Sequence, residues 1–73
     1  MGEVNRYRLG DNIVRILKQK KMTQKELAER CGIGERLISK YVCGHHIPSY
    51  IVLYRISRAL EVTLEDLVEG IEG

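Results

Sequence analysis

MTQKELAERCGIGERLISKYVCG, residues 22–44, is the stretch of sequence that decides the fold. Ala28 is small enough to let a second helix cross close to the first. Gly32 can adopt the positive φ that ends a helix and turns the chain. Ile38 is a stiff β-branched residue placed at the angle between the two helices. The spacing of these residues predicts two short helices joined by a tight turn, which is a helix-turn-helix motif.

The first helix of the motif has a complete start signal in the sequence. Thr23 stands at the N-cap and Glu26 follows three residues later, which is the pattern of a capping box. Met22 before the cap and Leu27 after it are placed to form a hydrophobic staple. We therefore expect a helix over about 24–31.

The second helix of the motif is expected from its cap at Gly34 to about Cys43, with Gly44 as its stop. Outside the motif, apolar residues at helical spacing predict three more helices. These are expected over about 10–20, from Pro48-Ser49 onward, and over about 64–69. The predicted fold class is all-α, a compact five-helix domain without strands.

Seventy-three residues are enough for one domain. We expect a loose arm over 1–8, the helical domain over 9–69 and a C-terminal tail over 70–73. No apolar run approaches the roughly 20 residues of a membrane span, and we find no signal peptide. These features predict a cytoplasmic protein without a membrane partner, in which Cys31 and Cys43 stay reduced.

Charge is distributed unevenly along the chain. Residues 1–58 hold all 12 Lys and Arg against five acids, a balance of +7, whereas residues 59–73 hold five acids and no base, a balance of −5. Such asymmetry indicates that one end meets a polyanion while the other faces away from it. The alternative is that both charged runs are solvated helix faces.

Cys43, His45 and His46 lie close enough in sequence to suggest a metal site. The fixed paired spacing of zinc ligands is missing, however, so we expect neither a metal nor a cofactor. The sequence also lacks a nucleophile–base–acid constellation, a phosphate-binding glycine loop and paired carboxylates held in a cleft. We therefore do not expect an enzyme.

The span from Leu9 to Val68 resembles the lambda-repressor-like domain, also called the Cro/C1-type or XRE-family helix-turn-helix domain. The residues that carry the resemblance are Thr23–Glu29, Gly32-Ile33, Ile38–Tyr41, Gly44, Pro48-Ser49, Leu60 and Val62–Leu67. The resemblance implies a DNA-binding transcriptional regulator, and we expect a repressor. Members of this family usually bind double-stranded DNA as a dimer on a two-fold symmetric operator.

Base contacts are expected from the second helix of the motif, which presents Glu35, Arg36, Ser39 and Lys40 on the face away from its buried side. Arg36 can donate to guanine O6 and N7, and Glu35 can accept from cytosine N4. Alternatively, Glu35 only complements the helix N-terminus and Lys40 is a solvated charge. Leu37 is expected to pack under the first helix of the motif rather than contact a thymine methyl.

Phosphate contacts are expected near helix N-termini, with Gln24 as the strongest candidate. The other candidates are Thr23, Lys25, Gly34, Cys43 through its backbone, His45 and Tyr50. Arg15 and Lys18 could extend the basic face. Neutralising about five phosphates per subunit would make the affinity depend steeply on salt.

The chain departs from the family in two places. Many members carry an Arg and a Glu that form a largely buried ion pair, where this chain has Leu17 and Val42. Replacing a buried ion pair by packed apolar groups is often neutral or stabilising, so we expect Leu17 and Val42 to touch. The second departure is His45-His46-Ile47, where relatives often have Lys or Arg, which weakens the expected phosphate contacts of this loop.

A dimer surface is predicted from apolar residues that stand beside the core positions, namely Ile51, Val52, Tyr54, Val68 and Ile71. A short chain cannot cover all of them, and an exposed apolar patch commonly marks an interface. The family's dimer contacts lie in the same region, so we expect a homodimer that places two recognition helices about one DNA turn apart. The alternative is a monomer that dimerises only on DNA.

A protein-interaction module on the same fold is the alternative function of another class. Antitoxins and anti-repressors use such domains to bind a protein partner. Salt-insensitive binding of a partner through Ile51 and Val52 would support this alternative, whereas binding that weakens with salt and with Arg36→Ala would support DNA recognition.

Overall fold

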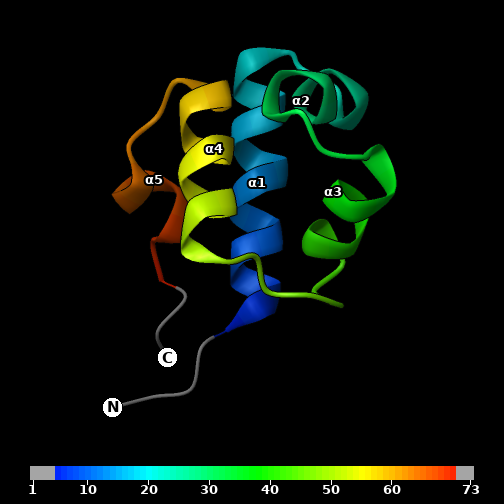
Figure 1. Cartoon of the computed structure of the whole chain (residues 1–73). Coiled ribbons are helices and arrows are strands. Elements are labelled where there is room, and N and C mark those ends of the chain that lie inside the picture. The colour runs from blue at the N-terminus through cyan, green and yellow to red at the C-terminus, as the bar shows by residue number, and fades with distance from the viewer. Residues whose placement is uncertain (1–4, 71–73) are drawn as a thin grey trace.

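The computed structural model describes residues 5–70, apart from the side chain of Arg6, and within this range it contains five helices and no strand. The helices are α1 (Arg6–Lys20), α2 (Gln24–Cys31), α3 (Glu35–Val42), α4 (Tyr50–Leu60) and α5 (Leu64–Val68). α1 and α4 stand side by side, with α2 and α3 on one side of them and α5 on the other (Figure 1). The all-α, five-helix class expected from the sequence is confirmed.

α1 begins at Arg6 rather than near residue 10 because Asn5 caps it. The side-chain oxygen of Asn5 accepts a hydrogen bond from the backbone N–H of Arg8 at 3.0 Å. The apolar spacing used to predict this helix starts only at Leu9, so its first turn was missed. Residues 6–8 are helical, which shortens the arm expected over 1–8, and residues 1–4 and 71–73 lie outside the described part of the chain.

α2 has the start and the end that the sequence predicted. The Thr23 hydroxyl accepts a hydrogen bond from the Glu26 backbone N–H at 3.1 Å, and the Glu26 carboxylate accepts one from the Thr23 backbone N–H at 3.1 Å. Gly32 ends the helix at φ 72°, in the left-handed region that glycine enters without a steric penalty. A second capping box, between Thr63 and Asp66, starts α5.

The core is built almost entirely from aliphatic side chains. Ile38 of α3 is fully buried where α2 and α3 meet, and the small side chain of Ala28 lies buried on α2. The buried cluster comprises Leu9, Ile13, Ile16, Leu17, Leu27, Ala28, Cys31, Ile38, Tyr41, Ile56, Leu60 and Leu67. Leu37 is half-buried against this cluster, as expected. The arrangement anchors the apolar side of α3 in the core of the domain.

α1 and α3 approach each other backbone to backbone at Gly10. A Cβ atom on Gly10 would lie 2.1 Å from the carbonyl oxygen of Val42, so only glycine fits there. Val42 itself is half-buried against the cluster that contains Leu17. Val42 is thus not in solvent, and direct contact between the side chains of Leu17 and Val42 stays a prediction.

Asn12 is a buried polar residue that ties α1 to α5. Its side-chain amide donates hydrogen bonds to the carbonyl oxygens of Leu67 at 2.9 Å and Glu69 at 2.8 Å. The last carbonyl groups of a helix have no partner within the helix, and Asn12 satisfies two carbonyls at this end. The position of α5 on the domain therefore depends on a side chain from the first helix.

Among the described residues, none of the helices has the length and hydropathy needed to cross a bilayer.

Candidate nucleic-acid interface

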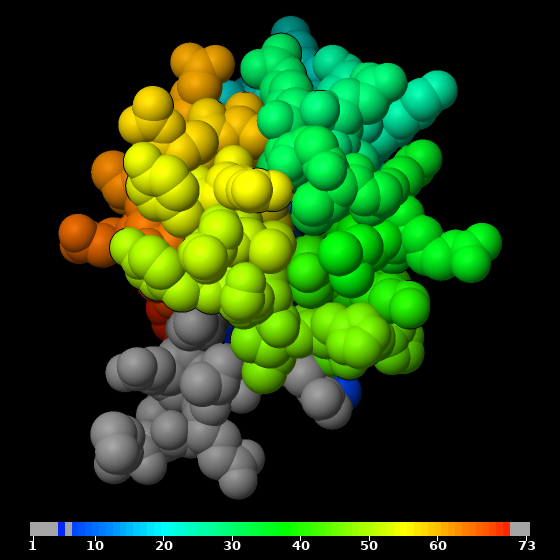
Figure 2. All heavy atoms as spheres, viewed as in Figure 1, coloured from blue at the N-terminus to red at the C-terminus, as the bar shows by residue number. Residues whose placement is uncertain are grey.

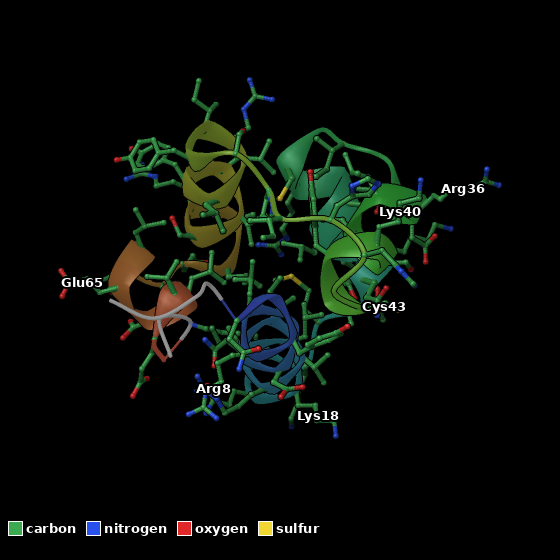
Figure 3. All side chains as sticks on the ribbon, turned by 90° about the horizontal axis from the view of Figure 1, so that it is seen from below. Arg8, Lys18, Arg36, Lys40, Cys43 and Glu65 are labelled. Carbon is green, nitrogen blue, oxygen red and sulfur yellow. The ribbon has the colours of Figure 1, made fainter. Side chains whose placement is uncertain are left out.

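α3 divides cleanly into a buried and an exposed side. Ile38 and Tyr41 point into the domain, whereas Glu35, Arg36 and Lys40 are exposed. The labelled side chains of Arg36 and Lys40 extend outward at the α3 side of the molecule, away from α1 and α5 (Figure 3). Three of the four residues predicted to contact bases thus lie on one accessible helix face.

Ser39, the fourth candidate for a base contact, is half-buried and has a partner within the protein. Its hydroxyl donates a hydrogen bond to Oε1 of Gln24 at 2.9 Å, which links α3 to the first residue of α2. Because this bond uses the carbonyl oxygen of the Gln24 amide, the NH₂ group remains as a donor. A donor at this place suits the phosphate contact predicted for Gln24.

The N-termini of α2 and α3 carry the other phosphate candidates of the motif. Thr23 is engaged in the capping box, and Lys25 is exposed on the first turn of α2. Gly34 begins α3 without a side-chain cap, so no side chain occupies the first-turn N–H groups of this helix. Exposed N–H groups at a helix N-terminus are suited to bind an anion.

The loop after α3 brings an unforeseen residue next to the candidate site. Gly44 has φ 80°, and a Cβ atom there would lie 2.7 Å from Cδ1 of Tyr7, so the tyrosine ring lies directly against the loop. Cys43 and His45 are exposed on the loop, and Tyr50 is exposed at the start of α4. Sequence reasoning placed Tyr7 in a loose arm, and the Asn5 cap was the signal that would have placed it on α1.

The cations of α1 do not continue the exposed face of α3. Lys18 leaves α1 on a different side of the molecule from Arg36 and Lys40 (Figure 3), and Arg15 lies beside Lys18 on the same face of α1. The suggestion that Arg15 and Lys18 extend the basic face is therefore wrong.

The two cysteines are free thiols with different surroundings. Cys43 is exposed, whereas Cys31 is buried beside α4. Burial raises the pKa of the Cys31 thiol, although the positive charge of Arg55 acts in the opposite direction. A raised pKa keeps this thiol protonated and unreactive at neutral pH. Within residues 5–70, no group of three or more His, Cys, Asp or Glu is placed to hold a metal ion.

A family model described as helix-turn-helix matches residues 13–67. The chain belongs to this helix-turn-helix family. The uncharacterized HTH-type transcriptional regulator YqaE of Bacillus subtilis (strain 168) is 37% identical to it over 60 residues, which cover 82% of this chain and 52% of YqaE. The chain thus spans about half the length of that relative.

Two solved structures of regulators superpose closely on the chain. SinR of Bacillus subtilis, described as a master regulator for biofilm formation and solved in complex with DNA, gives a TM-score of 0.78 at 27% identity, covering 84% of this chain and 98% of SinR. The P22 c2 repressor, solved in complex with a synthetic operator, gives 0.77 at 26% identity, covering 85% of this chain and 94% of the repressor. The predicted resemblance to the Cro/C1-type helix-turn-helix family is confirmed.

This helix-turn-helix domain exposes apolar side chains around the start of α4. Ile51 is 65% exposed and Tyr54 48%, whereas Val52 and Val68 are half-buried and Ile71 lies outside the described residues. Tyr50, predicted to contact phosphate, and Ile47, which the sequence analysis did not assign to the dimer surface, are also exposed large apolar residues. Ile47 could have been noticed as an apolar residue in an otherwise polar loop.

Proposed function

We propose that this helix-turn-helix protein is a sequence-specific, DNA-binding transcriptional repressor that acts as a homodimer on a two-fold symmetric operator. The observation that carries the proposal is the exposed side of α3, which presents Glu35, Arg36 and Lys40 while Ile38 holds the opposite side in the core. A helix presented in this way fits the major groove of B-DNA. The DNA complexes of SinR and the P22 c2 repressor, both above 25% identity, support the same function.

Base recognition is assigned to α3. Arg36 donates to O6 and N7 of a guanine, Glu35 accepts from N4 of a cytosine, and Lys40 reaches a guanine or a phosphate farther along the groove. Ser39 donates a hydrogen bond to the Gln24 amide, so it contributes to DNA binding at least in part by orienting that amide.

Phosphate binding is assigned to the helix starts and the loop that flank α3. Gln24 donates its free NH₂ group, Lys25 adds a positive charge, and the uncapped N–H groups that follow Gly34 donate to a phosphate. Thr23, Cys43 through its backbone, His45 and Tyr50 are the remaining proposed contacts. These groups fix the orientation of α3 in the groove and carry no sequence information of their own.

The proposed dimer forms through the exposed apolar side of α4 together with α5. Ile51 and Tyr54 are the exposed members of this surface, and Val52 and Val68 lie half-buried beside them. Aromatic side chains are enriched in protein interfaces, and Tyr54 is an exposed aromatic residue on this surface. We place the protein in the cytoplasm, where it meets DNA.

Selection from random duplexes tests the DNA-binding function directly. Two inverted half-sites are expected among the selected sequences, because a two-fold dimer contacts the operator symmetrically. Replacing Arg36 by alanine is expected to cost about 1–3 kcal/mol of binding free energy and to relax one base position, whereas Gln24→Ala weakens all sequences alike.

Lys18→Ala is the matched control, because Lys18 is an exposed cation on another side of the molecule. It is expected to leave the selected sequence and the affinity unchanged. An affinity that changes neither with salt concentration nor with the Arg36→Ala substitution would contradict the proposal. It would favour a protein-interaction module that uses Ile51 and Val52.

A further inference from the structure

Four helix ends in the described part of the chain close with the same pair of backbone hydrogen bonds, the Schellman motif. A residue at positive φ donates its N–H to the carbonyl oxygen three residues earlier, and the next residue donates its N–H to the carbonyl oxygen five residues earlier. An apolar side chain on that second donor often packs against the helix that it follows. The second donors are Met22 after α1, Ile33 after α2, His45 after α3 and Val62 after α4.

The end of α3 is the exception among these four. Met22, Ile33 and Val62 are partly buried against the core, whereas His45 is polar and exposed. The N–H of His45 donates to the carbonyl oxygen of Lys40 at 2.9 Å, and the side chain of Lys40 is exposed as well. In Figure 2 the loop after α3 lies at the lower edge of the coloured surface. The residues of this turn therefore do not supply the apolar contact that closes the other three.

Tyr7 of α1 supplies that contact from outside the motif. A Cβ atom on Gly44 would lie 2.7 Å from Cδ1 and 2.9 Å from Cε1 of the tyrosine, so the ring covers the glycine directly. Gly44 is buried, although Cys43 and His45 on either side of it are exposed. Because glycine has no side chain, the aromatic ring reaches the backbone of the turn itself. The end of α3 is thus closed by a residue of the first helix.

A second contact fixes α1 against the same end of α3. Gly10 lies one turn after Tyr7 on α1, at a place where a Cβ atom would clash with the carbonyl oxygen of Val42. Residues three apart on a helix share a face, so Tyr7 and Gly10 together support the last turn of α3 and the loop that follows it. Figure 1 shows this loop passing the first turns of α1. The Asn5 cap holds those turns in helical form, which keeps the ring in place.

We propose that Tyr7 is a positioning residue for DNA binding. Its ring holds the turn after α3 in one conformation, so that the phosphate contacts proposed for Cys43 and His45 are in place before DNA binds. Ordering a loop during binding costs free energy, and a loop that is already ordered avoids that cost. The same turn includes Lys40, whose carbonyl oxygen accepts the hydrogen bond from His45. The inference rests on the proposed DNA-binding function and adds to it a residue outside the helix-turn-helix motif.

Tyr7→Ala in the full-length chain tests the inference, and because Tyr7 is 61% exposed, its removal leaves the core intact. Operator affinity is expected to fall about three- to tenfold, evenly across single-base variants, since the loop must then be ordered on binding. The salt dependence of the affinity should stay the same, because no charge is removed. In the free protein, amide hydrogen exchange is expected to become faster at Gly44 and His45. It should not change at Gly32 and Ile33, where the same motif carries its own apolar residue.

Tyr7→Phe is the matched variant, because it keeps the ring, and it should keep both the affinity and the exchange rates. A loss as large as that of Tyr7→Ala would show that the hydroxyl group itself contacts DNA, and would overturn the positioning role. An unchanged affinity of Tyr7→Ala would overturn it too, as would equally faster exchange at both turns, since Tyr7 would then only stabilise the whole domain. A wild-type chain that selects no duplex would overturn the proposed function itself, together with this role.

Discussion

A single hydrogen bond joins the two kinds of DNA contact proposed for this domain. The Ser39 hydroxyl on α3 holds the Gln24 amide at the start of α2 with its oxygen inward. An amide held in this way offers its NH₂ group to an acceptor, and a phosphate oxygen is only an acceptor. Ser39 is therefore best regarded as a positioning residue, although the sequence predicted a base contact.

Replacing Ser39 by alanine should weaken DNA binding evenly across sequences. Loss of one neutral hydrogen bond corresponds to about 0.5–1.5 kcal/mol, and no base position should be relaxed. Fluorescence anisotropy with the operator and with single-base variants measures both effects. In a double-mutant cycle, Ser39→Ala should add little to Gln24→Ala, because the two residues act through one amide.

Ser39→Thr is the matched variant, since it keeps the hydroxyl group and should keep most of the affinity. A loss confined to one base position would instead show that Ser39 contacts that base directly, as the sequence had suggested.

At the scale of single elements, the helix ends show what can be predicted from sequence. The capping box at Thr23 and the stop at Gly32 were predicted because each depends on residues within four positions of one another. The bonds from Asn12 to the end of α5 span more than fifty positions, and no local pattern announces them. The Asn5 cap could have placed Tyr7 on α1, but its position against Gly44 could not be predicted, because Gly44 is distant in sequence.

The candidate site follows the same division. The exposed side of α3 could be predicted because helical periodicity alone separates Arg36 and Lys40 from Ile38. The hydrogen bond between Ser39 and Gln24 depends on how α2 and α3 pack against each other. Residue spacing within one helix does not contain that information.

The end of α1 makes a stability prediction at this scale. Lys21 has φ 54° and Glu61 φ 58°, so two non-glycine residues occupy the left-handed region at helix ends. Glycine enters this region without the steric cost that a Cβ atom imposes. Lys21→Gly should therefore raise the free energy of unfolding by about 0.5–1 kcal/mol, measured by urea denaturation.

Lys20→Gly is the matched control, because it makes the same change one residue earlier, inside α1. There glycine should lower the free energy of unfolding, by less than the roughly 1 kcal/mol of a helix interior because Lys20 is the last helical residue. Equal destabilisation by both substitutions would show that the left-handed residue at position 21 carries no strain.

At the scale of the whole molecule, the arrangement of charge matters more than its sum. The net charge is only +2, but Arg36 and Lys40 extend from one end of the view in Figure 3 and Glu65 from the opposite end. A field of this shape turns the α3 side toward a polyanion and keeps α5 away from it.

The salt dependence of operator binding measures how many of these cations meet phosphates. Of the proposed contacts on α2 and α3, Lys25, Arg36 and Lys40 carry full positive charge, whereas Gln24, Thr23 and Gly34 carry none. Because Arg36 is assigned to a base, a dimer in which Lys25 and Lys40 each neutralise one phosphate per subunit should give a slope of log K against log salt of about −4, shallower than the value near −9 for five neutralised phosphates per subunit.

Two substitutions then divide the affinity into its charged and neutral parts. Lys25→Ala should reduce the steepness of that slope by about 2 for the dimer, one lost cation on each subunit. Gln24→Ala should weaken binding at every salt concentration and leave the slope unchanged, because an amide releases no counterion. If Gln24→Ala changed the slope as much as Lys25→Ala, Gln24 would be positioning the cations and would not itself bind a phosphate. The N-terminus of α2 would then serve to position α3, and its assignment as a phosphate contact would be wrong.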